Sequence, residues 1–234
     1  MPPRLPCPCR LFLFDLDGTL IDSVPDIATS VNLALSRMQL GALDAGRIAS
    51  FVGDGVRKLI ERSLREVLER EPEESLVLDA VELYQQEYAL HLLDSTQLFP
   101  GVRETLARLS WGRLAVVSNK PEGFSKRILE ALGVLGCFCT VIGGDSMAER
   151  KPDPAPLHEA VRRCGVTAGD AVMIGDSVVD VRAGRAAGII TCAIAREESA
   201  RRALVLAGCD LVLGDFSELA ECFCPVGGDR RSSR

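Results

Sequence analysis

Two carboxylates stand close together near the start of the chain, in the string Asp15-Leu-Asp-Gly-Thr19. They end the apolar run Arg10 to Asp15, which is typical of a strand buried on both faces of a parallel sheet. Residues two apart in an extended chain point to the same side, so Asp15 and Asp17 face one space. Gly18 allows a sharp backbone turn, and the Thr19 hydroxyl can hold that loop. The string therefore predicts two acids that share a site.

Four further polar residues stand at or just beyond the ends of later apolar runs. Ser118 closes one run, Lys151 follows another after a short polar stretch, and Asp176 and Asp180 come at the end of a third. Taken singly, they are typical of helix caps, first-turn acids or solvated charges. Because the carboxyl ends of parallel strands meet at one edge of an open sheet, we expect all four beside Asp15.

Apolar runs alternate with helical patterns through most of the chain. This alternation predicts an α/β fold, a doubly wound and mostly parallel Rossmann-like sheet with right-handed connections. The further strand-like runs are residues 114–118, 140–143, 171–175, 189–193 and 210–213, and the helical patterns are residues 122–132, 155–164, 178–187 and 197–207.

Residues 23–96 break the alternation, because consecutive helical patterns follow one another there with no strand between them. Pro25 suits the first turn of a helix that Ser23 or Asp22 caps, and apolar stripes recur at residues 56–68 and 76–93. We therefore expect a small helical cap domain at 23–96, inserted into an α/β core formed by residues 1–22 and 97–234.

These motifs as a set resemble those of the haloacid dehalogenase-like hydrolase superfamily, and most of all its phosphoglycolate phosphatase branch. Asp15-Leu-Asp-Gly-Thr-Leu-Ile-Asp22 resembles the first family motif, Ser118 the second, Lys151 the third, and Gly175-Asp176 with Asp180 the fourth. The string Ser118-Asn-Lys-Pro121 is similar to the one found in phosphoglycolate phosphatases, and the helical insertion resembles the small α-helical cap of the family.

The resemblance implies a phosphatase that uses Mg²⁺. Four aspartates carry a formal charge of −4 against +1 from Lys151, so a divalent cation is needed before a carboxylate can approach a phosphate dianion. Mg²⁺ prefers hard oxygen ligands, which the Asp15 and Asp176 side chains and the Asp17 carbonyl would supply, as in the family. Asp180 is either a further ligand or the group that positions Lys151.

The resemblance also assigns roles in catalysis. Asp15 would be the nucleophile that forms an aspartyl-phosphate, and Asp17 would protonate the leaving alkoxide and later deprotonate water. The transferring phosphoryl group would be bound by the following backbone amides together with the side chains of Thr19, Ser118, Asn119 and Lys151.

Substrate choice is expected to lie in the cap. Gly53-Asp54-Gly55 precedes a helix whose first turns carry Arg57, and we expect Arg57 to contact the carboxylate of a small substrate such as 2-phosphoglycolate. A Gly-rich turn with solvated charges is the alternative. A phosphosugar phosphatase, a phosphomutase of the same superfamily, and a silent metal- or phosphate-binding regulatory protein also remain open.

Composition limits the partners. The chain has 27 Lys+Arg against 33 Asp+Glu and a net charge of −6, and it has no basic stripe, so nucleic acid is not expected. With 47% hydrophobic and 26% charged residues, it can bury a core. No apolar run reaches the length of a bilayer span, and no membrane partner is expected. We expect a small phosphorylated metabolite as partner and a monomer or homodimer.

Nine cysteines occur in the chain. Their odd number and the absence of a secretory signal from residues 1–10 favour reduced thiols in the cytoplasm. Three C-x-C pairs with two histidines make a zinc site the weaker interpretation.

Overall fold

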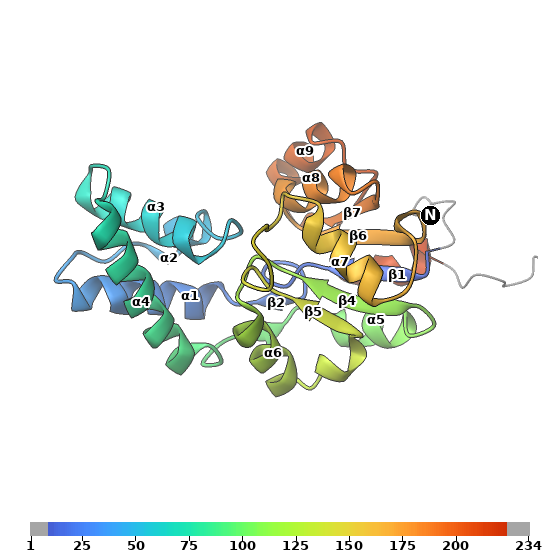
Figure 1. Cartoon of the computed structure of the whole chain (residues 1–234), viewed down its shortest axis with the longest axis horizontal. Coiled ribbons are helices and arrows are strands. Elements are labelled where there is room, and N and C mark those ends of the chain that lie inside the picture. The colour runs from blue at the N-terminus through green and yellow to red at the C-terminus, as the bar shows by residue number, and fades with distance from the viewer. Residues whose placement is uncertain (1–8, 224–234) are drawn as a thin grey trace, which may run out of the picture.

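A six-stranded parallel sheet forms the centre of the computed structural model, which describes residues 9–223 (Figure 1). Its strand order is β5-β4-β1-β6-β7-β8. The chain builds one side of the sheet from β1 outwards and then returns to build the other side, which leaves a crevice at the carboxyl end of β1. The strands are β1 (Leu11–Phe14), β4 (Arg113–Val117), β5 (Thr140–Ile142), β6 (Ala171–Gly175), β7 (Ile190–Ile194) and β8 (Leu211–Leu213).

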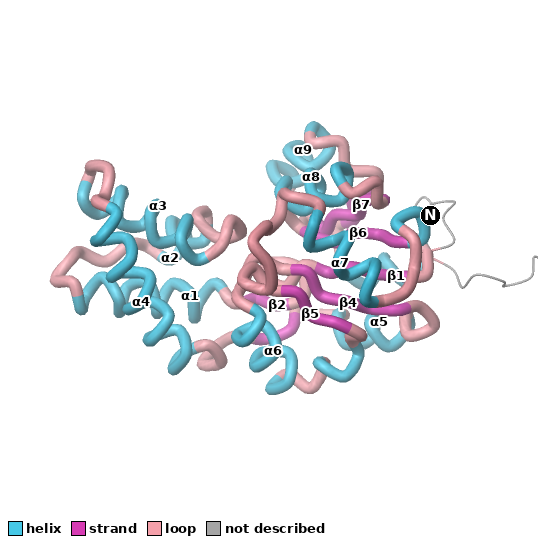
Figure 2. Tube along the Cα trace, in the orientation of Figure 1, coloured by secondary structure: helices cyan, strands magenta, loops and turns pink. Residues whose placement is uncertain are grey.

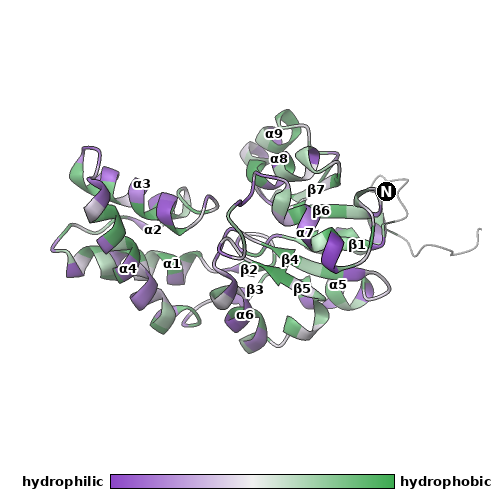
Figure 3. Cartoon of the chain, viewed as in Figure 1, coloured by the Kyte–Doolittle hydropathy of each residue, from purple (hydrophilic) through white to green (hydrophobic). Residues whose placement is uncertain are grey.

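The apolar runs become strands because both faces of the sheet are covered. All four residues of β1 are fully buried. Phe12 and Phe14 join the hydrophobic cluster on one face, and Leu11 and Leu13 join the cluster on the other. This alternation follows from the two-residue period of a strand, and Figure 3 shows the strands as mostly hydrophobic.

Helices cover the two faces of the sheet and connect its strands. They are α5 (Val102–Arg108), α6 (Glu122–Ala131), α7 (Ala155–Arg163), α8 (Val178–Ala186), α9 (Glu198–Leu206) and α10 (Leu219–Cys222), and short 3₁₀ turns occupy Leu135–Cys137, Ala168–Asp170 and Phe216–Glu218. The loops that follow the strands gather at the end of the sheet that faces four further helices (Figure 2). The α/β fold with a doubly wound sheet is confirmed.

Four helices lie between the short strands β2 (Ile21–Asp22) and β3 (Gln97–Leu98) in the sequence. They form a separate layer beyond that end of the sheet (Figure 1). They are α1 (Val24–Arg37), α2 (Ala45–Ala49), α3 (Val56–Leu68) and α4 (Glu74–His91). Apolar side chains spaced along each helix form their buried faces, including Ile27 and Val31 of α1 and Leu64 of α3. The exact bounds 23–96 for a cap domain remain a prediction.

Two chain segments join these four helices to the sheet, and they are bound to each other. β2 (Ile21–Asp22) pairs antiparallel with β3 (Gln97–Leu98). One turn into α1, the buried carboxylate of Asp26 accepts hydrogen bonds from the amides of Ser95 and Thr96 and from the Thr96 hydroxyl, at 2.7–3.0 Å. The outgoing and returning segments are therefore held together at both ends of this short connection.

Three local features differ from the sequence-based expectations. Ser23 occupies the N-cap of α1, but its hydroxyl makes no cap hydrogen bond and donates to Asp17 instead. Helix α5 (Val102–Arg108) is not among the helical patterns predicted from the sequence. Cys139 and Cys164 form a disulfide with a Cα–Cα distance of 6.6 Å, where reduced thiols were expected.

Among residues 9–223, no helix combines the length and apolarity needed to cross a membrane. Residues 1–8 and 224–234, with Cys7 and Cys224 of two of the C-x-C pairs, lie outside the described residues.

Candidate active site

Asp15 lies where β1 ends, at the crevice of the sheet. Its amide donates to the carbonyl of Ile174 at 2.8 Å, which extends the pairing of β1 with β6 by one residue. Its side chain is buried, with the residue 8% exposed. The neighbouring strand ends thus fix the carboxylate in a cavity with little water.

Asp176 and Asp180 approach Asp15 from the loop after β6 and from the first turn of α8. One carboxylate oxygen from each of the three residues lies within 4.8 Å of the others. Three carboxylates at this spacing provide the hard oxygen donors that a divalent cation prefers. The structure therefore brings together an acidic triad that can bind a metal ion.

Burial and mutual repulsion disfavour the ionised triad when no cation is bound. Burial, together with the nearby carboxylates of Asp15 and Asp180, raises the pKa of Asp176 to about 8. Burial is also the main reason that the pKa of Asp15 is raised to about 6; Lys151 opposes this rise, and Asp180 and Asp17 add to it. A divalent ion would remove this repulsion, so the residues fit a metal site.

Lys151 is the buried cation beside the triad. Its Nζ lies 2.6 Å from Oδ1 of Asp180 and 2.9 Å from Oδ1 of Asp15. Burial lowers the pKa of Lys151, but the two carboxylates outweigh this effect and hold it above its usual value. The ammonium therefore stays charged and next to the expected nucleophile.

Asp180 is fully engaged within the protein. Its Oδ1 accepts from Lys151, and its Oδ2 accepts from the hydroxyl and amide of Ser177 at 2.6 and 3.2 Å, which completes a capping box at the start of α8. These bonds fix Asp180 as a rigid support for the Lys151 ammonium.

Asp17 lines the same pocket as Asp15, but its carboxylate is not part of the triad. Its carboxylate accepts from Lys120 Nζ at 2.9 and 3.1 Å and from the Ser23 hydroxyl at 2.5 Å. Sequence reasoning missed Lys120, although it stands in the Ser118-Asn-Lys-Pro121 string. The signal was its place two residues beyond Ser118, at the carboxyl end of β4.

The remaining core residues predicted from the sequence also lie at this edge. Thr19 donates to Oδ1 of Asp176 at 2.8 Å, so it holds a carboxylate of the triad. The Ser118 hydroxyl accepts from the Lys120 amide at 3.3 Å. Asn119 Nδ2 donates to the carbonyls of Gly53 and Lys151, at 3.0 and 2.9 Å, and so bridges the helical layer and the sheet.

Two glycines are required by close packing around the acids. Gly18 has a φ of +82°, and a Cβ there would collide with the Asp176 carboxylate. A Cβ at Gly175 would collide with Asp180. Only glycine lets the first strand loop and the end of β6 approach these side chains so closely.

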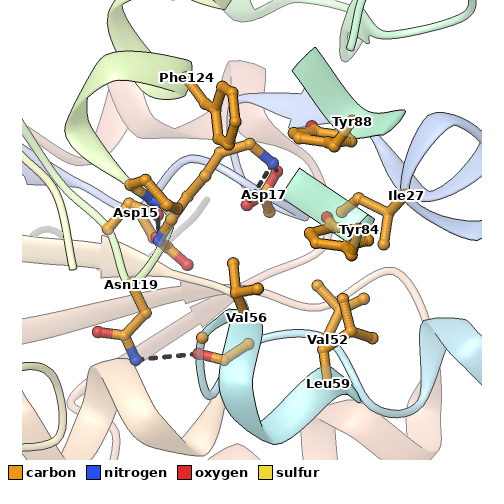
Figure 4. A pocket seen from close by; sticks show the side chains of 15 residues that line it. Asp15, Asp17, Ile27, Val52, Val56, Leu59, Tyr84, Tyr88, Asn119 and Phe124 are labelled. Atoms are coloured by element: carbon orange, nitrogen blue, oxygen red, sulfur yellow. Dashed lines mark hydrogen bonds and ion pairs between the residues drawn. The ribbon is translucent and has the colours of Figure 1, made fainter. Parts of the chain in front are cut away.

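A pocket lies between the acids and the four helices. Figure 4 shows Tyr84 and Tyr88 of α4 on the side opposite Asp15. The polar residues Asp15, Asp17, Ser118, Asn119 and Lys120 share this pocket with apolar and aromatic walls. Those walls are Ile27, Val52, Val56, Leu59, Tyr84, Tyr88, Pro121 and Phe124, with Gly53 and Gly55.

Arg57 is not brought to this pocket. Its guanidinium pairs with Glu61 at 2.9 Å and with Glu74 at 2.5 Å. It lines a second cleft with Lys58 and Arg62 of α3 on one side and with Arg150, Lys151 and Pro152 of the core on the other.

Comparisons with known proteins agree with this arrangement. The family model described as haloacid dehalogenase-like hydrolase matches residues 12–194. A phosphoglycolate phosphatase from Nitrosospira multiformis is 41% identical over 187 residues, 79% of this chain and 82% of that protein. One from Chromobacterium violaceum is 36% identical over 208 residues, 88% of this chain and 92% of that protein.

Solved structures show the same fold. A crystal structure of a predicted phosphoglycolate phosphatase from Haemophilus somnus 129pt superposes with a TM-score of 0.83 at 28% identity, covering 93% of this chain and 99% of that one. The resemblance to the superfamily and its phosphoglycolate phosphatase branch is confirmed. With the family model spanning most of the sheet and the four helices, the chain belongs to the haloacid dehalogenase-like hydrolases.

Proposed function

We propose that this chain is a Mg²⁺-dependent phosphatase that hydrolyses a small phosphate monoester, foremost 2-phosphoglycolate. The observation that carries the proposal is the convergence of Asp15, Asp176 and Asp180 with Lys151 at one buried edge of the sheet, beside a pocket. The names of the relatives that cover most of the chain support the choice of substrate.

The chemistry proceeds in two displacements at phosphorus. A carboxylate oxygen of Asp15 attacks, the ester P–O bond breaks, and Asp17 gives its proton to the departing alkoxide. Asp17 then takes a proton from water as the water oxygen attacks the aspartyl-phosphate, which releases inorganic phosphate and restores Asp15. The contact of Asp17 with Lys120 and Ser23 supports this role, because it fixes the orientation of the acid.

The metal would be held by the side chains of Asp15 and Asp176 and by the backbone carbonyl of Asp17. When bound, Mg²⁺ supplies positive charge that screens the carboxylates from the phosphate dianion. The hydrogen bonds of Asp180 favour its part as the support of Lys151 over that of a metal ligand. Lys151 then offsets the charge on the transferring phosphoryl oxygens.

The phosphoryl group would be held by the Ser118 hydroxyl and by the backbone amides after β4. Thr19 contributes through Asp176, and Asn119 contributes by joining the loop around Gly53 to the core. A substrate contact by Arg57 stays a prediction. We further propose that the protein acts in the cytoplasm on a metabolite rather than on nucleic acid, as a monomer or homodimer.

Phosphate release from 2-phosphoglycolate, with Mg²⁺ or with EDTA, tests the proposal. Asp15→Asn is expected to abolish turnover, because an amide cannot serve as the nucleophile. Asp17→Asn is expected to slow it at least about 10²-fold, because the acid and base are lost. Both variants should keep the wild-type circular dichroism spectrum. Full activity of Asp15→Asn would overturn the mechanism, and full activity in EDTA would overturn the metal requirement.

A further inference from the structure

The pocket beside Asp17 contains a single cation. Among the described residues that line it, Lys120 is the only one with a positive charge, and its side chain is 5% exposed. Most of the remaining wall is apolar or aromatic, from Ile27 on α1 to Phe124 on α6. A charged group of a substrate would therefore be poorly solvated in this pocket unless Lys120 met it.

Lys120 retains capacity to bind a ligand. A lysine ammonium has three N–H donors, and its neighbours are the two oxygens of one carboxylate, Asp17, at 2.9 and 3.1 Å. It also lies over the ring of Tyr88, with Nζ 4.6 Å from the centroid. These contacts hold the ammonium at the pocket wall, where a substrate anion can share it with Asp17.

A second polar group faces the same space. Tyr88 is 1% exposed and lines the pocket, and its hydroxyl has no hydrogen-bond partner within the described part of the chain. A buried hydroxyl normally has a partner. A bound anion would supply the missing partner, because it can accept one hydrogen bond from the Tyr88 hydroxyl and one from the Lys120 ammonium.

The distance between the two functional groups of 2-phosphoglycolate also points to Lys120. This step rests on the proposed function, in which Asp17 protonates the ester oxygen of the leaving group. In 2-phosphoglycolate, one methylene separates that oxygen from the carboxylate. A group that contacts Asp17 directly, as Lys120 does, is therefore within reach of the substrate carboxylate.

We propose that Lys120, assisted by the Tyr88 hydroxyl, is the residue that recognises the carboxylate of the substrate and so selects 2-phosphoglycolate over neutral phosphate esters. Arg57, the residue expected from the sequence to make this contact, lines the neighbouring cleft and pairs there with two glutamates, so the two assignments give different results in the test below. Lys120 also keeps Asp17 in position, and this second effect applies to every substrate.

Two substrates separate these effects. Ethyl phosphate has the skeleton of 2-phosphoglycolate, with a methyl group in place of the carboxylate. In Lys120→Met, kcat/KM should fall for both compounds because Asp17 is less well held. The preference for 2-phosphoglycolate, given by the ratio of the two kcat/KM values, should fall by a further factor of about 10 or more, the scale of one charge-assisted hydrogen bond.

Other variants make the test specific. Lys120→Arg keeps the charge and should recover part of the preference. Tyr88→Phe should lower the preference several-fold, and it decides the matter even if Lys120→Met does not fold. Lys126→Met is the matched control, because Lys126 is exposed, pairs with Glu122 and does not line the pocket.

Two results would overturn the assignment. One is an equal loss for both substrates in Lys120→Met with an unchanged preference in Tyr88→Phe. The other is a collapse of the preference in Arg57→Ala alone. A wild-type protein that releases phosphate from neither compound in Mg²⁺ would instead overturn the proposed function, so the two failures are distinguishable.

Discussion

Asp176→Asn is expected to stabilise the metal-free protein at pH 8 although it removes a metal ligand. The pKa of Asp176 is raised from 3.8 to about 8, chiefly by burial and then by Asp15 and Asp180. Between pH 3.8 and about pH 8 the folded state therefore keeps a proton on Asp176 that the unfolded state has released. The free energy of unfolding falls as the pH rises through this range. Asparagine has no such proton and can still accept from Thr19.

The size of the change in unfolding free energy follows from the pH range over which Asp176 is protonated only in the folded state. Between pH 5 and pH 8 the unfolded carboxyl is ionised and the folded one is largely protonated, so each pH unit costs about 1.4 kcal/mol. Wild type should lose up to about 4 kcal/mol of unfolding free energy over this range relative to Asp176→Asn. Below about pH 4 the difference should become independent of pH.

Urea unfolding in EDTA at pH 5, 6.5 and 8 measures the difference. Asp44→Asn is the matched control. Asp44 is the exposed N-cap of α2 and accepts a hydrogen bond from the Gly46 amide, which an asparagine side chain can also accept. It should keep the wild-type pH dependence. Saturating Mg²⁺ should flatten the wild-type profile and leave Asp176→Asn unchanged. Equal pH dependence of wild type and Asp176→Asn in EDTA would refute the electrostatic account of the triad.

Three further outcomes follow from the structure. Asp26→Asn should lower the unfolding free energy by about 2–4 kcal/mol in thermal or urea unfolding, because one amide oxygen replaces a carboxylate that accepts four hydrogen bonds. Asn119→Ala should cost about 1–3 kcal/mol in the same measurement through the lost bonds to Gly53 and Lys151, and a loss below 0.5 kcal/mol would contradict that bridge. Gly18→Ala should weaken Mg²⁺ binding at least about tenfold in calorimetry, since its Cβ displaces the metal-binding carboxylate; unchanged affinity would contradict the packing argument.

Much of the sheet was predictable because its signals are local. The run that forms β1 is apolar at every position, and a helix follows each later run, so strand ends and order along the chain could be assigned within about a residue. The pairing of β2 with β3 could not be predicted. It involves only Ile21–Asp22 and Gln97–Leu98, two short segments that are far apart in the sequence and carry no strand-like pattern of their own.

The site was predictable where residue type alone sets the role. Asp15 and Asp176 directly follow strands and Lys151 lies in the loop after β5, and the sheet brings the three together. Lys120 was missed because its role depends on side-chain direction, which places the ammonium on Asp17. Arg57 was expected at the substrate because it follows a Gly-rich turn. In the structure its guanidinium pairs with glutamates on α3 and α4, and its contact with a substrate stays a prediction.

The paired segments that join the two layers have a mechanical consequence. β2 and β3 pair with each other, and Asp26 joins the first turn of α1 to the returning chain, so the two linkers form one connected unit. Ser23, at the start of α1, donates to Asp17. A change in the angle between the four helices and the sheet would therefore also shift the Asp17 carboxylate through this hydrogen bond.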